Sequence, residues 1–180
     1  MAILIDSFLP ISLVNELEKV ITHHQFPWYW RPSTKYGIED GNESSEDFQF
    51  IHLIYYDGTV QSEIFELVRN IVQGFANSTN IAIKNIYKIK ANLLTKQTLS
   101  SEALHETVHI DVEGSNFLSI IYYVTEADGD TVIFNKNNEV DLQISPKKGS
   151  AVYFPSNLNH RATPPTNYKR RIVLNIVVEI

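Results

Sequence analysis

The stretch HETVHID, residues 105–111, contains two metal-binding patterns that belong to different folds. His105, Glu106 and His109 have the spacing of a zinc-binding helix, in which histidines four residues apart share one face. His109 and Asp111 instead have the two-residue spacing that puts both side chains on one side of an extended strand. The choice between helix and strand therefore decides both the fold and the candidate metal ligands.

β-Branched residues dominate the segment that follows Glu106, which reads Thr-Val-His-Ile-Asp-Val. Such side chains lose rotamer freedom in a helix and pack well on the pleated surface of a strand. Gly114 follows soon afterwards and would end a helix early. We therefore favour a strand in which His109 and Asp111 point to one side, with His105 upstream in a loop. The helical zinc site remains the alternative.

The rest of the chain changes its hydrophobic periodicity once. Residues 12–24 and 60–75 carry apolar side chains at helical spacing, which predicts two amphipathic helices that cover a sheet. The polar segment 33–47 between them predicts a loop, and residues 48–56 predict a strand. From residue 81 onward the period is two. This part predicts strands near 81–94, 117–125, 130–134, 139–144, 150–154 and 171–179.

Helices followed by many short strands predict a mostly β fold, a sandwich or barrel backed by flanking helices. A chain of 180 residues is long enough for one domain with a proper core. We therefore expect residues 1–180 to form a single domain.

Composition narrows the classes of function. Hydrophobic residues make up 43% and charged residues 20%, and no apolar run approaches the roughly 18 residues of a membrane span. The absence of cysteine excludes disulfides, thiolate zinc sites and thiol catalysis. The net charge is −6 and the longest basic cluster is residues 169–171, so we expect no nucleic-acid partner. The N-terminal segment has no basic leader, which argues against a secretory signal. The lack of cysteine suits a reducing cytoplasm, so we expect a cytoplasmic protein of the cell or of a phage-infected host.

A third candidate ligand lies far along the chain. The stretch GSAVYFPSNLNHR, residues 149–161, places His160 just beyond a predicted strand and a turn that contains Pro, Ser and Asn. Two histidines and one carboxylate that leave coordination positions open are the ligand set that suits Fe(II) and its chemistry with O2. His109, Asp111 and His160 are therefore the candidate metal ligands. The alternative is that they are ordinary polar residues.

The ordered set of His109-x-Asp111, His160 and then Arg170-Arg171 on the last predicted strand resembles the iron(II)- and 2-oxoglutarate-dependent oxygenases. The likeness is greatest to the prolyl-4-hydroxylase-like branch and its small phage and bacterial members. It covers residues 81–179 well and the first 80 residues only in outline. Three segments carry it, namely YKIKANLL (87–94), SIIYYVTEADGDTVIF (119–134) and PKKGSAVYFPSNLNHRATPPTNYKRRIVLNI (146–176).

The resemblance implies a fold and a set of cofactors. The fold would be a double-stranded β-helix, or jelly roll, in residues 81–179, with helical support mainly from residues 1–80. The cofactor would be Fe(II), with 2-oxoglutarate and O2 as cosubstrates. The resemblance implies hydroxylation of a C–H bond with release of succinate and CO2. The substrate would be a small molecule or a peptide, and the resemblance neither chooses between them nor indicates an oligomeric state.

Three further residues receive candidate roles from the resemblance. An arginine of the last strand would bind the distal carboxylate of 2-oxoglutarate through its planar guanidinium. Arg171 shares a strand face with the polar Asn175, whereas Arg170 shares the more apolar face, so Arg171 is the preferred candidate. Tyr123 resembles the tyrosine that contacts the cosubstrate, or else it fills the barrel. Asn92 either donates to 2-oxoglutarate or satisfies buried backbone.

Two other functions stay open at this point. A zinc metallopeptidase would use His105, Glu106 and His109, and a non-catalytic jelly-roll binding module would keep the motif without the activity. The polar segments 33–47 and 95–103 are candidate lids, because function tends to reside on such loops.

Overall fold

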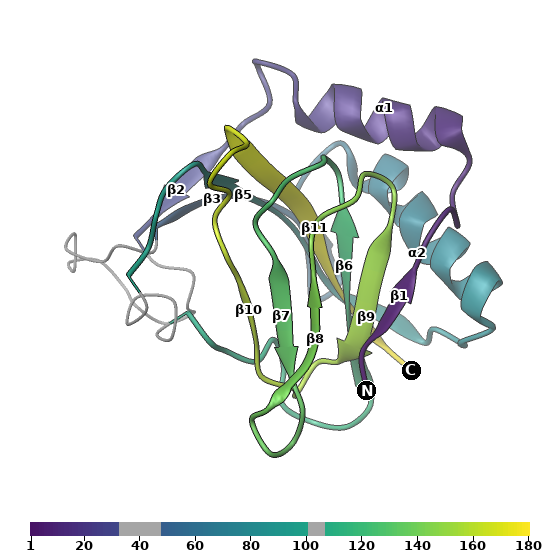
Figure 1. Ribbon diagram of the computed structural model, residues 1–180. Helices are drawn as coiled ribbons and strands as arrows, with labels where there is room; N and C mark the ends of the chain where they lie inside the picture. Colours follow the sequence, from purple (N-terminus) through teal and green to yellow (C-terminus); the bar gives the residue numbers. More distant parts are fainter. Residues whose placement is uncertain (33–47, 101–106) are drawn as a thin grey trace.

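The structure, a computed structural model, describes residues 1–32, 48–100 and 107–180 (Figure 1). The predicted loop 33–47, residues 101–103 of the candidate lid 95–103, and both His105 and Glu106 lie outside the described residues. The described chain is mostly β, with two helices. In chain order the elements are β1 (Ile3–Ile5), α1 (Ile11–Ile21), β2 (Tyr29–Arg31), β3 (Gln49–Tyr56), β4 (Thr59–Val60), α2 (Phe65–Thr79), β5 (Asn85–Thr95), β6 (Phe117–Tyr123), β7 (Thr131–Phe134), β8 (Val140–Ile144), β9 (Ala151–Pro155), β10 (His160–Ala162) and β11 (Arg170–Glu179).

Two antiparallel sheets face each other. The larger sheet has the strand order β1-β9-β6-β11-β5-β3-β2, with β4 paired to β3, and the smaller sheet has the order β10-β7-β8. Both helices lie on the side of the larger sheet that faces away from β7, β8 and β10 (Figure 1). This arrangement confirms the predicted mostly β fold of jelly-roll type, and it leaves the space between the two sheets for a site.

Strand β11 separates two cores, because its side chains alternate between the faces of the larger sheet. Ile172, Leu174 and Ile176 pack with the helices, and their partners include Leu17 and Ile21 of α1 and Ile71 and Phe75 of α2. Val173 points the other way, into a smaller core between the sheets that also contains Ile121, Tyr123, Ile133, Val152, Phe154 and Leu158. The predicted face assignment of this strand is therefore correct.

The helices and strands begin and end close to the predicted positions, with two kinds of difference. Helix α2 starts at Phe65 rather than near residue 60, because Asp57 and Gly58 form a positive-φ turn and residues 59–60 pair back onto β3 as β4. The short strands β1, β2, β4 and β10 were not predicted. A strand of two or three residues is too short to show an alternating pattern in the sequence. Such a strand forms because it pairs with a neighbouring strand.

Neither helix in the described residues is long and apolar enough to cross a membrane.

Gly129 lies where the turn before β7 passes close to another segment. A Cβ at this position would meet the backbone of residues 163–165, with Thr163 O at 2.3 Å. The carbonyl oxygen of Gly129 also accepts a hydrogen bond of 2.8 Å from Nε of Arg171. The absence of a side chain therefore permits a close backbone approach that also supports the buried arginine.

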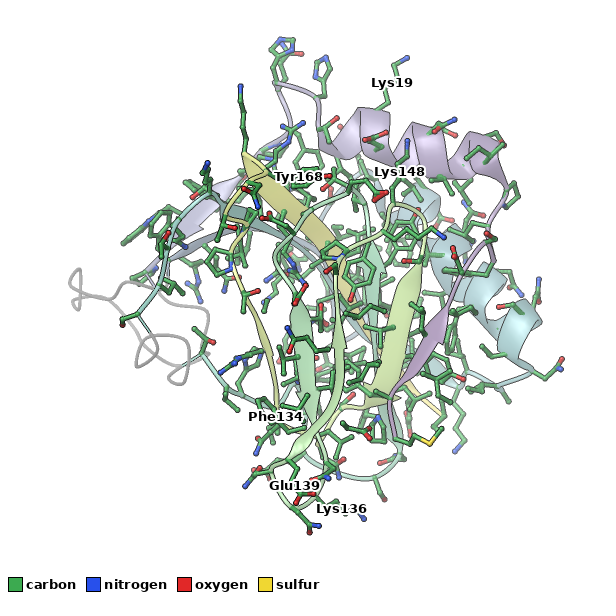
Figure 2. All side chains as sticks on the ribbon, viewed as in Figure 1. Lys19, Phe134, Lys136, Glu139, Lys148 and Tyr168 are labelled. Atoms are coloured by element: carbon green, nitrogen blue, oxygen red, sulfur yellow. The ribbon has the colours of Figure 1, made fainter. Side chains whose placement is uncertain are left out.

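Gly129→Ala is expected to lower the free energy of unfolding by about 1–3 kcal/mol, because the backbone must move apart to admit the new methyl group. Urea unfolding monitored by circular dichroism measures this change. Lys136→Ala, in the exposed turn between β7 and β8 (Figure 2), serves as the control and should change stability by no more than about 0.5 kcal/mol. Equal stability of Gly129→Ala and the wild type would contradict the close approach.

Candidate metal centre

The segment around His109 is tied to β10 by backbone hydrogen bonds. The amide of His109 donates to the carbonyl of His160 at 3.0 Å, and the amide of His160 donates back at 2.9 Å. Beyond this isolated bridge, the amide of Asp111 donates to the carbonyl of Ser156 at 3.0 Å. Within residues 107–116 only His109 pairs, as an isolated bridge, and the chain then bends, so the favoured strand around His109 and Asp111 is wrong. The helical zinc alternative is also wrong, because His109 lies in a β-bridge.

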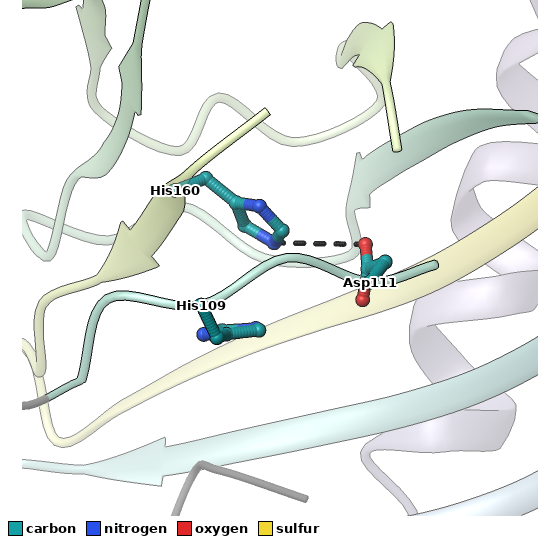
Figure 3. A group of neighbouring side chains, drawn as sticks. All are labelled: His109, Asp111 and His160. Carbon is teal, nitrogen blue, oxygen red and sulfur yellow. Dashed lines mark ion pairs between the residues drawn. The ribbon is translucent and has the colours of Figure 1, made fainter. Parts of the chain in front are cut away.

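The three candidate ligands converge despite this irregular backbone (Figure 3). One ligand atom from each of His109, Asp111 and His160 lies within 4.8 Å of the other two. Nε2 of His160 is 3.5 Å from Oδ2 of Asp111, and the two imidazole ring centroids are 4.5 Å apart. A single ion of ordinary coordination distance could therefore reach all three.

Hydrogen bonds from the second ring nitrogen orient both imidazoles. Nδ1 of His109 lies 2.8 Å from the carbonyl oxygen of Thr107, and Nδ1 of His160 lies 3.1 Å from that of Leu158. A carbonyl only accepts, so the proton of each neutral ring resides on Nδ1 and Nε2 keeps its lone pair. This pattern is the usual outer-shell support of metal-binding histidine.

Asp111 is held as an anion by neighbouring donors. Ser119 Oγ donates to Oδ2 at 2.6 Å, and Asn175 Nδ2 donates to Oδ1 at 2.9 Å. Nζ of Lys88 lies 3.7 Å from Oδ1, and only 4% of each of these two side chains is exposed. Burial alone would raise the pKa of Asp111, but the neighbouring His160, Lys88 and His109 and the hydrogen bond from Ser119 outweigh it and hold the pKa well below its usual range.

His109 is poised as a neutral ligand. Burial, followed by the neighbouring charge of His160, lowers the pKa of His109 to about 4. A neutral imidazole and a carboxylate anion are the protonation states that divalent metal binding requires. The donor set of two imidazole nitrogens and one carboxylate fits Fe(II), and neither a thiolate nor a fourth protein ligand is needed.

The metal-free protein is expected to lose stability on mild acidification. The pKa of His109 is about 4 in the folded state and about 6.5 in the unfolded chain, so the unfolded chain binds the proton more readily. Stability therefore falls as the pH drops from about 6.5 towards about 4. Between about pH 7 and about pH 5 the loss from this group is about 2 kcal/mol.

Urea unfolding in the presence of a chelator measures this loss at the two pH values. His109→Asn removes the titrating ring, so its stability should depend less on pH over the same interval. An identical pH dependence in the variant and the wild type would contradict the neutral, buried state of His109.

A cavity of about 50 Å³ opens beside the two histidines. Arg171 lines it and is only 2% exposed, whereas Arg170 is exposed to solvent. The guanidinium of Arg171 donates to the carbonyl of Gly129 at 2.8 Å and to Oγ1 of Thr131 at 2.7 Å, both neutral acceptors. Within the described residues Arg171 makes no ion pair. Its remaining donors can therefore bind an anionic ligand.

The structure places Tyr123 and Asn92 close to Arg171. The hydroxyl of Tyr123 donates to Oγ1 of Thr131 at 2.9 Å, and its ring centroid lies 6.0 Å from the guanidinium carbon of Arg171. Tyr123 is fully buried and does not line the cavity, whereas Asn92 does. Nδ2 of Asn92 donates to Gln49 at 2.7 Å, and its buried Oδ1 has no hydrogen-bond partner among residues 1–32, 48–100 and 107–180. Contact of either residue with 2-oxoglutarate stays a prediction.

Four polar residues near the site were not singled out from the sequence. Lys88 and Lys90 alternate along β5 with Ile89 and Ala91, which belong to the core beneath the helices. This alternation is visible in YKIKANLL and could have placed both lysines between the sheets. Ser119 and Thr131 give no such signal, because small hydroxyl residues occur at many positions in strands.

Ser119→Ala is expected to weaken metal binding about 10- to 100-fold, since the hydroxyl that fixes Oδ2 of Asp111 is lost. Titration of Mn(II) into the metal-free protein measures the affinity. Ser115→Ala, at an exposed position four residues earlier, is the matched control and should bind as the wild type does. Unchanged affinity in Ser119→Ala would show that the carboxylate needs no such support.

A jelly roll that brings two histidines and one aspartate together beside a buried arginine has the ligand set that suits non-haem Fe(II). Residues 98–178 match the family model described as the 2OG-Fe(II) oxygenase superfamily, and the matched segment includes the whole triad. This segment of the chain is therefore similar to that superfamily. The match confirms the expected oxygenase activity and its dependence on Fe(II), 2-oxoglutarate and O2.

Solved structures of similar fold agree with the observed architecture. A prolyl-4-hydroxylase from Pseudomonas putida is 14% identical with a TM-score of 0.64, and the match covers 99% of this chain and 91% of that one. A 2OG-Fe(II) oxygenase-family oxidoreductase from Burkholderia pseudomallei is 11% identical with a TM-score of 0.70, covering 99% and 84%. The viral collagen prolyl hydroxylase of Paramecium Bursaria Chlorella virus-1 is 15% identical with a TM-score of 0.54, covering 99% and 96%. These identities support the fold alone. A sequence comparison with curated proteins finds no match.

Proposed function

We propose that this chain, as one catalytic domain spanning residues 1–180, hydroxylates a C–H bond of a small molecule or peptide. His109, Asp111 and His160 hold Fe(II), and Arg171 binds the distal carboxylate of 2-oxoglutarate. The observation that carries the proposal is the buried Arg171, whose guanidinium lines the same cavity as both histidines and makes no ion pair within the described residues.

Bound Fe(II), together with O2 and 2-oxoglutarate, supplies the oxidising power of this family. The side chains of the protein prepare the site for it. Nε2 of His109 and of His160 present lone pairs because Nδ1 of each ring is engaged by a carbonyl. The Asp111 carboxylate offsets one charge of the metal. A protein of this kind contributes binding, orientation and exclusion of competing reactions.

Arg171 orients the cosubstrate in this proposal. Thr131 and Gly129 fix the guanidinium from one side, so that its planar fork is held before a ligand arrives. A carboxylate bound to such a fork in a buried cavity gains two charge-assisted hydrogen bonds. The 2-oxo acid end would then lie towards the triad. Ile121, Leu94 and Val173 provide the apolar part of the cavity wall.

The substrate range follows from the site and from relatives of the same fold. Prolyl hydroxylases are among the structures of similar fold, which makes a prolyl C–H bond one candidate.

Binding and turnover together test the proposal. Protein loaded with Mn(II), which does not support turnover, should bind 2-oxoglutarate in a calorimetric titration, and the metal-free protein should bind it much more weakly. Protein loaded with Fe(II) in air should form succinate from 2-oxoglutarate. Absence of metal-dependent 2-oxoglutarate binding in the wild type would overturn the proposed function.

A further inference from the structure

Lys88 is a buried cation beside one ligand of the proposed iron site. It lies on β5 opposite Val177 of β11, and Val177 lies in turn opposite Ser119 of β6. Residues that are opposite each other on neighbouring strands share a face of the sheet, so these three form one row across it. Nζ of Lys88 is 3.7 Å from Oδ1 of Asp111, and Oγ of Ser119 donates to Oδ2 at 2.6 Å. Both ends of the row therefore contact the carboxylate.

Neutral hydrogen bonds fix the position of this carboxylate. Besides the bond from Ser119, Nδ2 of Asn175 lies 2.9 Å from Oδ1 and 3.2 Å from Oδ2 of Asp111. The amide of Asp111 also donates to the carbonyl of Ser156. A separation of 3.7 Å is too long for a hydrogen bond, so Lys88 acts on Asp111 through its charge. Removal of that charge should therefore leave the ligand in place.

The charge of Lys88 is shielded from water. Only 4% of the side chain of Lys88 and 4% of that of Asp111 are exposed, and charges interact more strongly where water is excluded. The neighbouring Lys88 is accordingly one of the causes that hold the pKa of Asp111 well below its usual range. Lys88 lies outside the lining of the cavity, so its influence reaches the site through Asp111 and not through contact with a ligand.

A fixed positive charge distinguishes between the two oxidation states of iron. Charges of like sign repel each other in proportion to their product. An ammonium close to the site therefore disfavours Fe(III) more than Fe(II), and it raises the reduction potential of the bound ion. The ferrous ion is the state that gives this family its name. The groups around the metal ligands are a general means by which proteins set such potentials.

We propose that Lys88 is a positioning residue that sets the redox state of the metal site. Its charge beside Asp111 raises the reduction potential of the bound iron and keeps the ion ferrous between turnovers. This inference rests on the proposed function, because it assumes that His109, Asp111 and His160 hold Fe(II). It goes beyond that function by assigning a role to a side chain that contacts neither the cosubstrate nor the substrate.

A redox titration tests this inference. The protein is loaded with Fe(II) in the absence of oxygen and of 2-oxoglutarate, and it is titrated with oxidised mediators of known potential. One electron passes from each Fe(II) to a mediator, and the Fe(III) formed is measured by its electron paramagnetic resonance signal. The midpoint potential reports the ratio of the affinities for Fe(III) and Fe(II). A merely structural support of Asp111 would change both affinities alike and leave the midpoint unmoved.

Lys88→Met keeps the length of the side chain and removes the ammonium, and it should raise the ratio of Fe(III) to Fe(II) affinity about tenfold or more. For one electron, each factor of ten lowers the midpoint by about 59 mV. Lys88→Gln removes the charge, keeps a hydrogen-bond donor and should show the same fall. Lys88→Arg keeps the charge and should titrate close to the wild type. Lys136→Met removes an exposed cation from the turn between β7 and β8 and should titrate as the wild type does (Figure 2).

The outcomes separate failure of this inference from failure of the proposed function. An unchanged or higher midpoint in a charge-free variant that holds iron would overturn the inference. Loss of iron from both Lys88→Met and Lys88→Gln would assign Lys88 to the assembly of the site and overturn it too. If the wild type holds iron but does not bind 2-oxoglutarate, the proposed function fails and the redox titration still decides the role of Lys88. If the wild type holds no iron, both proposals fail.

Discussion

Asp111→Asn is expected to reduce Mn(II) affinity more than 100-fold and to abolish formation of succinate by the Fe(II)-loaded protein. Loss of an outer-shell partner of a metal site costs about 10- to 100-fold in affinity, so loss of a charged ligand should cost more. Equilibrium dialysis measures the affinity, and circular dichroism reports whether the variant is folded. Asp57→Asn, in the exposed turn between β3 and β4, removes one negative charge elsewhere and should bind metal as the wild type does.

His105→Ala tests the competing use of the same sequence stretch. We expect this variant to bind Mn(II) with wild-type affinity. Loss of binding in His105→Ala together with normal binding in Asp111→Asn and in His160→Ala would contradict the assignment of the triad and return attention to a site built on His105 and Glu106.

Arg171→Ala is expected to lower the affinity of the Mn(II)-loaded protein for 2-oxoglutarate by between about 30-fold and several thousand-fold. Removing one member of a buried, hydrogen-bonded charge pair costs about 2–5 kcal/mol. Arg170→Ala is the matched control, because this neighbouring arginine is exposed and an exposed charge contributes little. Calorimetric titration with 2-oxoglutarate measures both variants.

The two arginine variants can also contradict the assignment. A large loss only in Arg170→Ala would mean that the cosubstrate binds on the other face of β11. A loss in neither variant would remove the arginine from cosubstrate binding altogether. Metal affinity should be unchanged in both, which separates an effect on 2-oxoglutarate from a general loss of the site.

Sequence patterns predicted the features of this protein that depend on local periodicity. The alternation of Arg171, Val173 and Asn175 against Ile172 and the other apolar residues of β11 predicted which face packs on the helices. The same reasoning applied to β5 would have placed Lys88 and Lys90 between the sheets. In both strands the assignment needs only neighbouring residues, because successive side chains of an extended chain point to opposite faces.

Features that depend on distant partners could not be predicted in this way. The chain around His109 is not a continuous strand. The amides of His109 and Asp111 donate to the carbonyls of His160 and Ser156, which lie some 45 to 50 residues later. The support of Asp111 by Ser119 and Asn175 likewise joins three separate elements. Local propensity contains no information on such contacts. The ligand types could be recognised from the sequence, but not the hydrogen bonds that orient them.

The reciprocal backbone pair between His109 and His160 has a consequence for metal exchange. The pair closes a loop of about fifty residues, and closing a loop of this size costs about 4 kcal/mol of chain entropy. Here backbone hydrogen bonds and the packing of the two cores offset this loss of entropy, so the loop closes without a bound ion. In zinc fingers the opposite holds, and chelation unfolds the domain. This protein should instead release its ion to a chelator as a folded, rigid receptor and accept another divalent ion of similar size without refolding.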